Sequence, residues 1–200
     1  FLYANARFAH NEKCVCPSPR PYPLIDWTLA VHPILRSTLA KTGKKAVPLD
    51  VTLTTDKRIL IISGPNAGGK SVCLKTVALL QYMLQCGLPI PVGENSRTGI
   101  FRSIFIDIGD EQSIENELST YSSHLYNMKM MMRSADGASL LLIDEFGGGT
   151  EPQIGAAMAE AMLRRFVDKK AFGIITTHYH NLKHFADAHE STVNGAMLYD

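Results

Sequence analysis

The feature that most constrains the fold is a glycine-rich segment between a short apolar run and a helical pattern. Residues 58–63 (RILIIS) are mostly apolar and β-branched, which is typical of a buried strand. Apolar residues then recur at helical spacing over 69–85, and Gly87 and Pro89 end that pattern. The segment between them, Gly64–Ser71 (GPNAGGKS), matches G-x-x-x-x-G-K-[ST] in full. Strand, loop and helix in this order predict a phosphate-binding loop.

Each residue of this segment has an expected role toward a nucleoside triphosphate. The glycines let the backbone curl, so that successive N–H groups point at phosphate oxygens near the positive end of the helix. Lys70 is expected to reach the β- and γ-phosphates, and Ser71 to offer its hydroxyl to Mg²⁺. The predicted ligand is ATP with Mg²⁺. The predicted nucleotide-binding residues are Gly64, Pro65, Asn66, Ala67, Gly68, Gly69, Lys70, Ser71 and Val72.

The rest of the chain alternates between strand and helix patterns. Residues 1–10 read as the end of a helix, and residues 14–23, with four prolines, read as an irregular connector. Further strands are expected at 47–53, 103–107, 139–144, 172–177 and 193–199, and helices at 118–133 (capped by Ser119 or Thr120), 154–167 and 181–188. This alternation predicts an α/β fold with a mostly parallel sheet covered by helices on both faces. Residues 1–30 are expected to lead into one domain formed by residues 31–200.

Two adjacent acids end the most apolar of these strands. Residues 140–143 are Leu-Leu-Leu-Ile, and Asp144 and Glu145 follow. An unpaired charge at the edge of a core is costly, so the two adjacent acids indicate a bound ligand. The alternative is that the strand simply leaves the core and exposes both acids to solvent. We expect Asp144 to hold Mg²⁺, partly through water, and Glu145 to orient and activate the attacking water.

Two further polar residues follow predicted strands. His178 follows Thr176-Thr177, where it can sense the γ-phosphate, although a lone histidine is more often structural. Gln112 follows the strand at 103–107 and can contact Mg²⁺ or the attacking water. The local sequence fits such a contact and the absence of one equally well. The remaining histidines are expected to be structural, and the methionines at 128 and 130–132 to pack in the core or against a neighbouring domain.

Composition excludes several other classes of protein. With 20 Lys and Arg against 19 Asp and Glu, the chain carries no overall charge that would draw it to a polyanion. The four cysteines do not form the paired clusters of a zinc site, and free thiols fit a reducing bacterial cytoplasm. No stretch is long and apolar enough to cross a bilayer, so no membrane partner is expected. The start at Phe1 without methionine indicates a fragment of a larger protein.

Three separated motifs together resemble the ATPase domain of the MutS family, a member of the ABC-type P-loop ATPases. They are Gly-Pro-Asn-Ala-Gly-Gly-Lys-Ser at 64–71, Asp-Glu-Phe-Gly-Gly-Gly-Thr at 144–150 and Thr-Thr-His-Tyr at 176–179. The LSGGQ-like signature of ABC transporters is absent, and Leu-Ser-Thr-Tyr-Ser-Ser-His at 118–124 resembles the MutS signature region instead. With residues 107–114, this segment is closest to the second, endonuclease-type branch of bacterial MutS proteins.

The resemblance implies a homodimer with composite ATP sites, each formed by one subunit's phosphate loop and the other's signature segment. Ser119 would then reach the γ-phosphate across the dimer, and His178 would act as the family's switch histidine. Residues 147–150 would line the subunit interface. The His32-Pro33-Ile34-Leu35 element would lie near the adenine.

The leading functional hypothesis is therefore an ATP-hydrolysing motor domain of an endonuclease-type MutS protein. The resemblance connects this branch to branched or recombining DNA, bound through other domains, and to suppression of recombination. It also connects the branch to splitting stalled ribosomes, so that nucleoid and ribosome are both candidate locations. The alternatives are a mismatch-recognition MutS and a dimerisation module that binds ATP without hydrolysis, which Glu145 argues against. A nuclease site within this chain is not supported, because no cluster of acids or histidines lies outside the ATP site.

Overall fold

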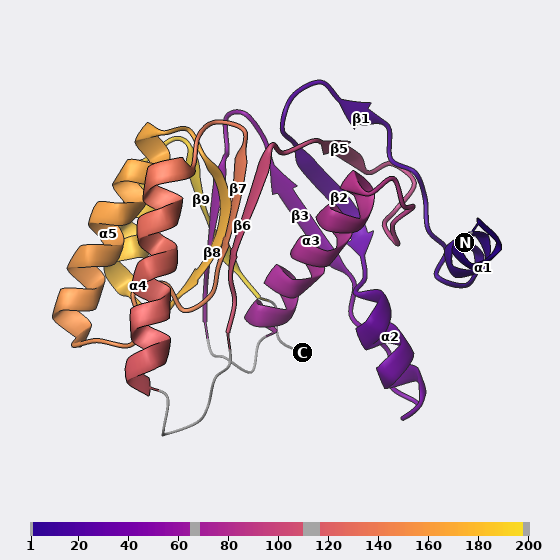
Figure 1. The fold of residues 1–200 in the computed structure, drawn as a ribbon, viewed down its shortest axis with the longest axis horizontal. Helices are drawn as coiled ribbons and strands as arrows, with labels where there is room; N and C mark the ends of the chain where they lie inside the picture. The colour runs from indigo at the N-terminus through magenta and orange to yellow at the C-terminus, as the bar shows by residue number, and fades with distance from the viewer. Residues whose placement is uncertain (1, 65–68, 110–116, 198–200) are drawn as a thin grey trace. The chain divides into compact units, whose positions relative to one another are not determined.

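The computed structural model describes residues 2–64, 69–109 and 117–197, except for the side chains of 117–121. The chain divides into two compact units (Figure 1). The first comprises residues 1–54 and 75–100, and the second comprises residues 55–74 and 101–200. Helix α3 (Lys70–Gln85) begins in the second unit and continues into the first. The expected domain boundary between residues 30 and 31 stays a prediction.

The second unit is built on a five-stranded sheet in which every strand is parallel to its neighbours. The strand order is β6-β7-β8-β4-β9. The strands are β4 (Ile59–Ser63), β6 (Ser103–Asp107), β7 (Ser139–Ile143), β8 (Phe172–Thr177) and β9 (Thr192–Ala196). All residues of β7 and β8 are buried, as expected for central strands covered on both faces. The predicted parallel α/β fold is confirmed.

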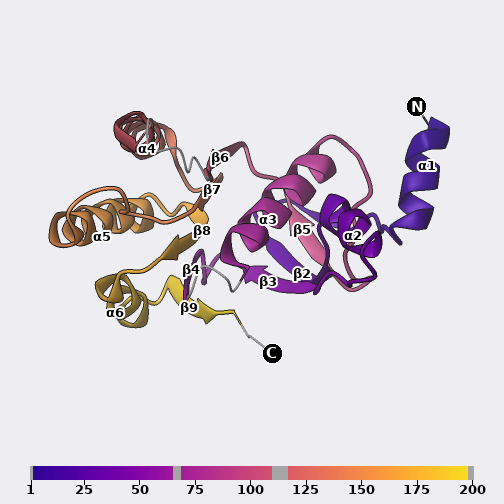
Figure 2. The ribbon, with the colours of Figure 1, turned by 90° about the horizontal axis from the view of Figure 1, so that it is seen from below.

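Three helices pack side by side along one face of this sheet (Figure 2). They are α4 (Glu117–Ser134), α5 (Pro152–Asp168) and α6 (His180–Ala188). Their apolar side chains form one core with alternate residues of the strands, including Met128, Met131, Leu141, Ile175 and Phe166. Met130 is exposed, so the methionines divide between core and surface. The three helices therefore cover one face of the five-stranded sheet.

Register brings the carboxyl ends of four neighbouring strands to one edge. Ser63 of β4 pairs with Thr177 of β8, and Asp107 of β6 pairs with Ile143 of β7. Ile143 in turn pairs with Ile175 of β8. The polar residues that follow each strand therefore emerge at the same edge, where parallel sheets bind ligands.

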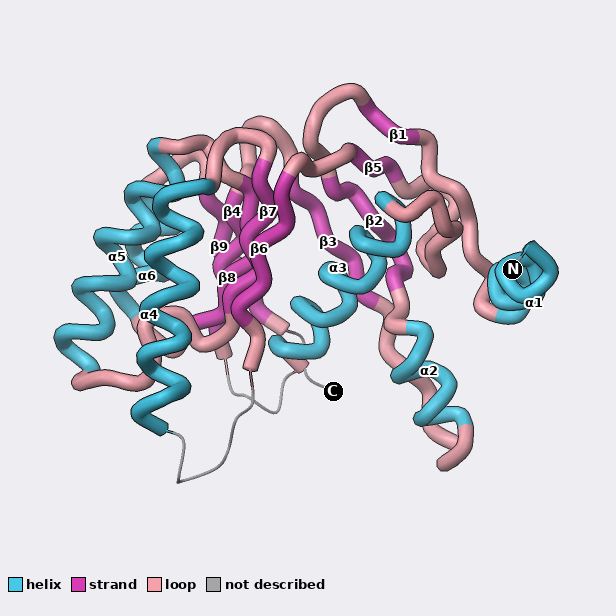
Figure 3. Tube along the Cα trace, viewed as in Figure 1, coloured by secondary structure: helices cyan, strands magenta, loops and turns pink. Residues whose placement is uncertain are grey.

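The first unit has a different sheet (Figure 3). Its strands are β1 (Pro19–Arg20), β2 (Ile25–Ala30), β3 (Leu49–Leu53) and β5 (Arg97–Gly99), in the order β1-β5-β2-β3. β2 is antiparallel to both β3 and β5, and it packs a fully buried Trp27. Two helices complete the unit, α1 (Leu2–Asn11) and α2 (Pro33–Ala40). Sequence patterns predicted α1 and β3 but not β2, α2 or β5.

One local expectation is wrong. Helix α4 starts at Glu117, so Ser119 is its third residue and neither Ser119 nor Thr120 is the N-cap. Of the two cysteines in or near α3, Cys73 is buried within the helix and Cys86 is exposed just after it. None of the helices in the described ranges is long and apolar enough to span a membrane.

Candidate nucleotide site

The phosphate loop connects β4 to α3, as the sequence predicts. Gly64 and Gly69, the described residues at its two ends, have φ angles of +136° and +80°. A Cβ atom at Gly64 would meet nothing within 4 Å, so glycine is needed there for its backbone conformation and not for space. Ser71 lies in the first turn of α3. The predicted residues Pro65, Asn66, Ala67 and Gly68 lie outside the described residues.

Lys70 is a buried cation at the start of α3. It is 2% exposed, and its ammonium group donates a hydrogen bond to the carbonyl oxygen of Gly64. Burial lowers the pKa of Lys70, whereas the nearby charges of Asp144 and Glu145 raise it. A buried lysine held at a helix N-terminus can bind an anionic phosphate, because both the charge and the helix dipole favour it.

Asp144 and Glu145 follow β7, and neighbouring strands hold them in place. Asp144 is 6% exposed; its N–H donates to the carbonyl oxygen of Asp107 (2.9 Å), and its carboxylate accepts a hydrogen bond from the Thr176 hydroxyl. The N–H of Glu145 donates to the same hydroxyl oxygen (2.8 Å). Glu145 is exposed and has a φ of +49°, a left-handed conformation that is strained for a residue with a side chain. Strain of this kind is characteristic of functional sites.

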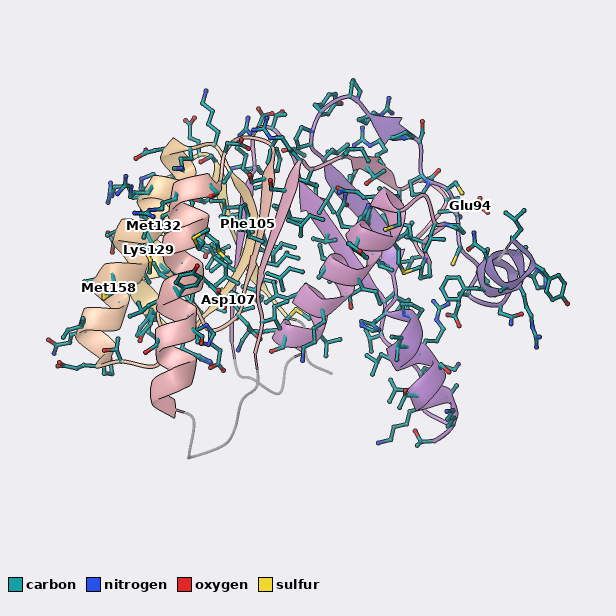
Figure 4. The ribbon with its side chains drawn as sticks, viewed as in Figure 1. Glu94, Phe105, Asp107, Lys129, Met132 and Met158 are labelled. Carbon is teal, nitrogen blue, oxygen red and sulfur yellow. The ribbon has the colours of Figure 1, made fainter. Side chains whose placement is uncertain are left out.

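A third carboxylate, Asp107 at the end of β6, connects helix α4 to the same edge (Figure 4). Its two oxygens contact His124 Nδ1 (2.7 Å) and accept a hydrogen bond from Asn127 Nδ2 (2.8 Å). The hydrogen bond with Asp107 raises the pKa of His124, with smaller contributions from the charges of Glu145 and Asp144, while burial opposes the rise. Sequence reasoning missed this cluster. The i, i+3 spacing of His124 and Asn127 on one helix was the only available signal.

The glycine run after the acids is packed tightly within the chain. Gly147 has a φ of +87°, and a Cβ atom there would lie 2.8 Å from the Tyr179 ring and 2.9 Å from the Ala159 Cβ. The Tyr179 hydroxyl donates to the carbonyl oxygen of Gly147 (3.0 Å). A Cβ atom at Gly155 would lie 2.6 Å from the Tyr179 hydroxyl. These contacts explain the need for glycine at 147 and 155; a role of residues 147–150 at a subunit interface stays a prediction.

The structure places the other predicted residues in different surroundings. His178 directly follows β8 and is exposed, and Val72 is exposed on the first turn of α3. The backbone of Ser119 lies in the first turn of α4, its side chain is not described, and Gln112 lies outside the described residues. His32 belongs to the first unit, where it is the N-cap of α2 and its Nδ1 accepts a hydrogen bond from the N–H of Leu35 (3.3 Å). Their roles toward a nucleotide stay predictions.

The donor set fits a triphosphate with a hard divalent cation. Ser71 and Asp144 supply the oxygen ligands that Mg²⁺ prefers, and phosphate oxygens normally complete such sites. Within the described ranges, no three His, Cys, Asp or Glu side chains converge as a metal site would require. The buried Lys70 suits binding of the phosphates, and the exposed Glu145 carboxylate suits contact with a water molecule.

Comparison with known proteins supports this interpretation. Residues 60–199 match the family described as MutS domain V. The whole chain is 44% identical to a protein named Endonuclease MutS2 from Lactiplantibacillus plantarum and 42% identical to one from Geobacillus kaustophilus, covering 25% of each. Over 92% of the chain, it is 46% identical to Endonuclease MutS2 from Thermomicrobium roseum, covering 22% of that protein.

The chain thus spans about a quarter of the length of these relatives. The family match covers both strand-end motifs, the glycine loop after β4 and the acids after β7. The chain belongs to the MutS family, as its ATPase domain V, and its similarity is to the MutS2 branch.

Proposed function

We propose that this domain binds ATP with Mg²⁺ and hydrolyses it to ADP and phosphate. The observation that carries the proposal is the placement of a buried Lys70, at the start of the helix after β4, and of Asp144 and Glu145, directly after β7, near enough for the charges of the acids to raise the pKa of the lysine. A lysine after one strand and an acid pair after another strand of the same sheet, here separated by β8, are the two halves of a P-loop hydrolytic site.

Each side chain has one task in this proposal. Lys70 and the N–H groups at the start of α3 bind and orient the phosphates. Ser71 and Asp144 would hold Mg²⁺, which neutralises charge on the phosphates when it is bound. Glu145, exposed at the end of β7, accepts a proton from the attacking water and directs it at the γ-phosphate. His178, at the end of β8, responds to the state of that phosphate.

In the whole protein, we propose that two copies of the domain form composite sites in a homodimer. Ser119 of one copy would then complete the site of the other, because the N-terminal turn of α4 favours an anion. The relatives are named endonucleases, which supports a nucleic-acid substrate bound through parts of the protein outside this chain. We propose branched or recombining DNA, with suppression of recombination as the outcome.

Two alternatives predict different results. Stalled ribosomes are the second candidate substrate. Binding measurements with the whole protein would distinguish ribosomes from DNA. A module that binds ATP without hydrolysing it would need no base, so the presence of Glu145, in a strained backbone conformation, favours hydrolysis.

Single-turnover hydrolysis by the whole protein tests the proposal. Glu145→Gln should slow hydrolysis by about 100-fold or more while preserving binding of a fluorescent ATP analogue. Lys70→Ala should abolish both, because it removes the buried cation that meets the phosphates. Glu94→Gln, an exposed acid of the first unit, is the matched control and should behave like the parent. Equal rates for the parent and Glu145→Gln would exclude Glu145 as the base.

A further inference from the structure

Thr176, the penultimate residue of β8, carries a hydroxyl group completely buried beside the two acids. Its exposed fraction is 0%, in a strand whose residues are all buried. Ile143 and Ile175 are the last paired residues of β7 and β8, so the next step along each strand places Thr176 alongside Asp144. Burying a hydroxyl is costly unless it is hydrogen-bonded, so its partners indicate its purpose.

The direction of each hydrogen bond follows from the donors available. The backbone N–H of Glu145 can only donate, so the Thr176 oxygen accepts from it (2.8 Å). The single hydroxyl proton is then directed at the carboxylate of Asp144, which accepts it. An ionised carboxylate suits this role, because it accepts from the hydroxyl and can still bind a cation.

The main chain of Thr176 extends the same contact. Its carbonyl oxygen accepts a hydrogen bond from the N–H of Phe146 (2.8 Å). One residue of β8 therefore holds three successive residues, Asp144 by its carboxylate and Glu145 and Phe146 by their N–H groups. Glu145, with a φ of +49°, lies in the middle of this contact. The hydroxyl thus helps to maintain a backbone conformation that residues with side chains rarely adopt.

The neighbouring Thr177 shows that this arrangement is specific to one position. Thr177 is equally buried, but its hydroxyl donates to the carbonyl oxygen of Phe146 (3.3 Å) and accepts from the N–H of Tyr179 (3.1 Å). Those partners stabilise the turns that follow β7 and β8. The Thr176 hydroxyl instead contacts the side chain of one acid and the backbone of the other.

We propose that Thr176 is a positioning residue that sets the Asp144 carboxylate for Mg²⁺ and the Glu145 side chain for the attacking water. This inference rests on the proposed ATP hydrolysis. Because Thr176 holds the acids and is not itself part of the phosphate loop, its hydroxyl should matter for turnover and for the response to Mg²⁺. Nucleotide affinity should depend on it little.

The test compares Thr176→Val, which keeps the shape and removes the hydroxyl, with Thr176→Ser, which keeps the hydroxyl, in the whole protein. Thr176→Val should lower the single-turnover rate by about 10- to 100-fold, as expected for removal of a group that orients a metal ligand. The Mg²⁺ concentration for half-maximal hydrolysis should rise, while binding of a fluorescent ATP analogue without Mg²⁺ should match the parent. Thr176→Ser should recover most of the rate.

Thr192→Val is the matched control for losing a buried threonine hydroxyl. Thr192 is 2% exposed, and its hydroxyl contacts the carbonyl oxygens of Ala186 and His189, in the segment joining α6 to β9. Under conditions in which Thr192→Val is folded, its hydrolysis rate should match that of the parent. Should Thr176→Val fail to fold, Thr176→Ala and Thr176→Ser give the same comparison, with thermal unfolding as the check.

The outcomes separate this inference from the proposed function. Parent-like hydrolysis by folded Thr176→Val or Thr176→Ala overturns the positioning role alone, provided that Glu145→Gln is impaired in the same assay. A serine variant as slow as the valine variant also overturns it, because the hydroxyl would not be the active feature. Absence of hydrolysis by the parent overturns both the inference and the proposed function.

Discussion

The two sheets of this protein place their polar residues in different ways. In the parallel sheet of the second unit, the central strands β7 and β8 are buried throughout, and acids and threonines lie where strands end, at Asp107, Asp144 and Thr177. The sheet of the first unit is mixed: β2 is antiparallel to β3 and β5, and β1 is parallel to β5. Buried and exposed residues are mixed within β2 and β3. An exposed ion pair there, Arg97 with Asp26, ties β5 to β2.

The difference shows how each sheet can serve function. Parallel strands all end at one edge, so short sequence segments far apart along the chain meet there with their polar groups. Antiparallel strands alternate in direction and offer no such common edge. We therefore expect substitutions in the first sheet to act mainly on stability and those at the strand ends of the second unit to act on turnover. Four measurements test this contrast.

The largest expected effect is on stability, from Trp27→Ala in β2. Trp27 is 1% exposed, and removing a buried tryptophan side chain leaves a cavity that should lower the free energy of unfolding by about 3–5 kcal/mol. Denaturant unfolding measures this loss. At temperatures where the variant remains folded, its ATP hydrolysis should stay near that of the parent. A large fall in hydrolysis by folded Trp27→Ala would contradict the expectation that substitutions in the first sheet act mainly on stability.

Compared with Trp27→Ala, Asp107→Asn should lower the unfolding free energy less and the rate of hydrolysis more. Asn keeps the size of the side chain but removes the charge that His124 and Asn127 share, at a cost of about 1–3 kcal/mol in unfolding free energy. Hydrolysis should fall more than in Trp27→Ala, despite the smaller loss of stability, because Asp107 anchors helix α4 beside the backbone of Asp144. Hydrolysis unaffected by Asp107→Asn would show that this anchor is only structural.

The pH dependence of stability gives a second measure of the same contact. The pKa of His124 is raised above its ordinary value of 6.5, chiefly by its hydrogen bond with Asp107. Because the pKa of His124 is higher in the folded than in the unfolded protein, protonation of His124 stabilises the folded state. This stabilisation is fully present at pH values below the unfolded-state pKa and is lost as pH rises through the folded-state pKa. The difference in unfolding free energy between the parent and Asp107→Asn should therefore be larger at about pH 6 than at about pH 9, on either side of the ordinary histidine pKa. A difference that grows with pH would contradict this assignment.

The smallest expected effect concerns His32, the one predicted nucleotide contact in the first unit. His32→Ala removes the N-cap of α2 and should cost about 1 kcal/mol, whereas His32→Asn keeps a capping acceptor and should cost less. If the ring also contacts adenine, both variants should weaken ATP binding to a similar extent. Titration with a fluorescent ATP analogue distinguishes the two roles. Unchanged affinity in both would leave His32 as a cap alone.

The sequence predicted the strands of the second unit better than those of the first. Parallel strands are largely apolar runs, so the edge strand β6 and the central strand β8 were both predicted with their exact bounds. β2 contains a register shift between Trp27 and Ala30, with Leu29 at a φ of +52°, and β5 has three residues. Neither strand gives a regular period of two. Short or irregular strands depend on their neighbours, which a local pattern cannot reveal.

The sequence by itself determined the chemistry of the candidate site. Gly64, Lys70, Ser71, Asp144 and Glu145 are recognisable because a phosphate loop and a strand-end acid pair need fixed residue types at fixed spacing. Only the tertiary structure decided how the acids are held. Thr176 is 31 residues from Glu145, and Asp107 is 17 from His124, so no local pattern links them. Their contacts exist because parallel pairing aligns the ends of β6, β7 and β8, and the direction of a buried hydrogen bond is fixed by its partners in space.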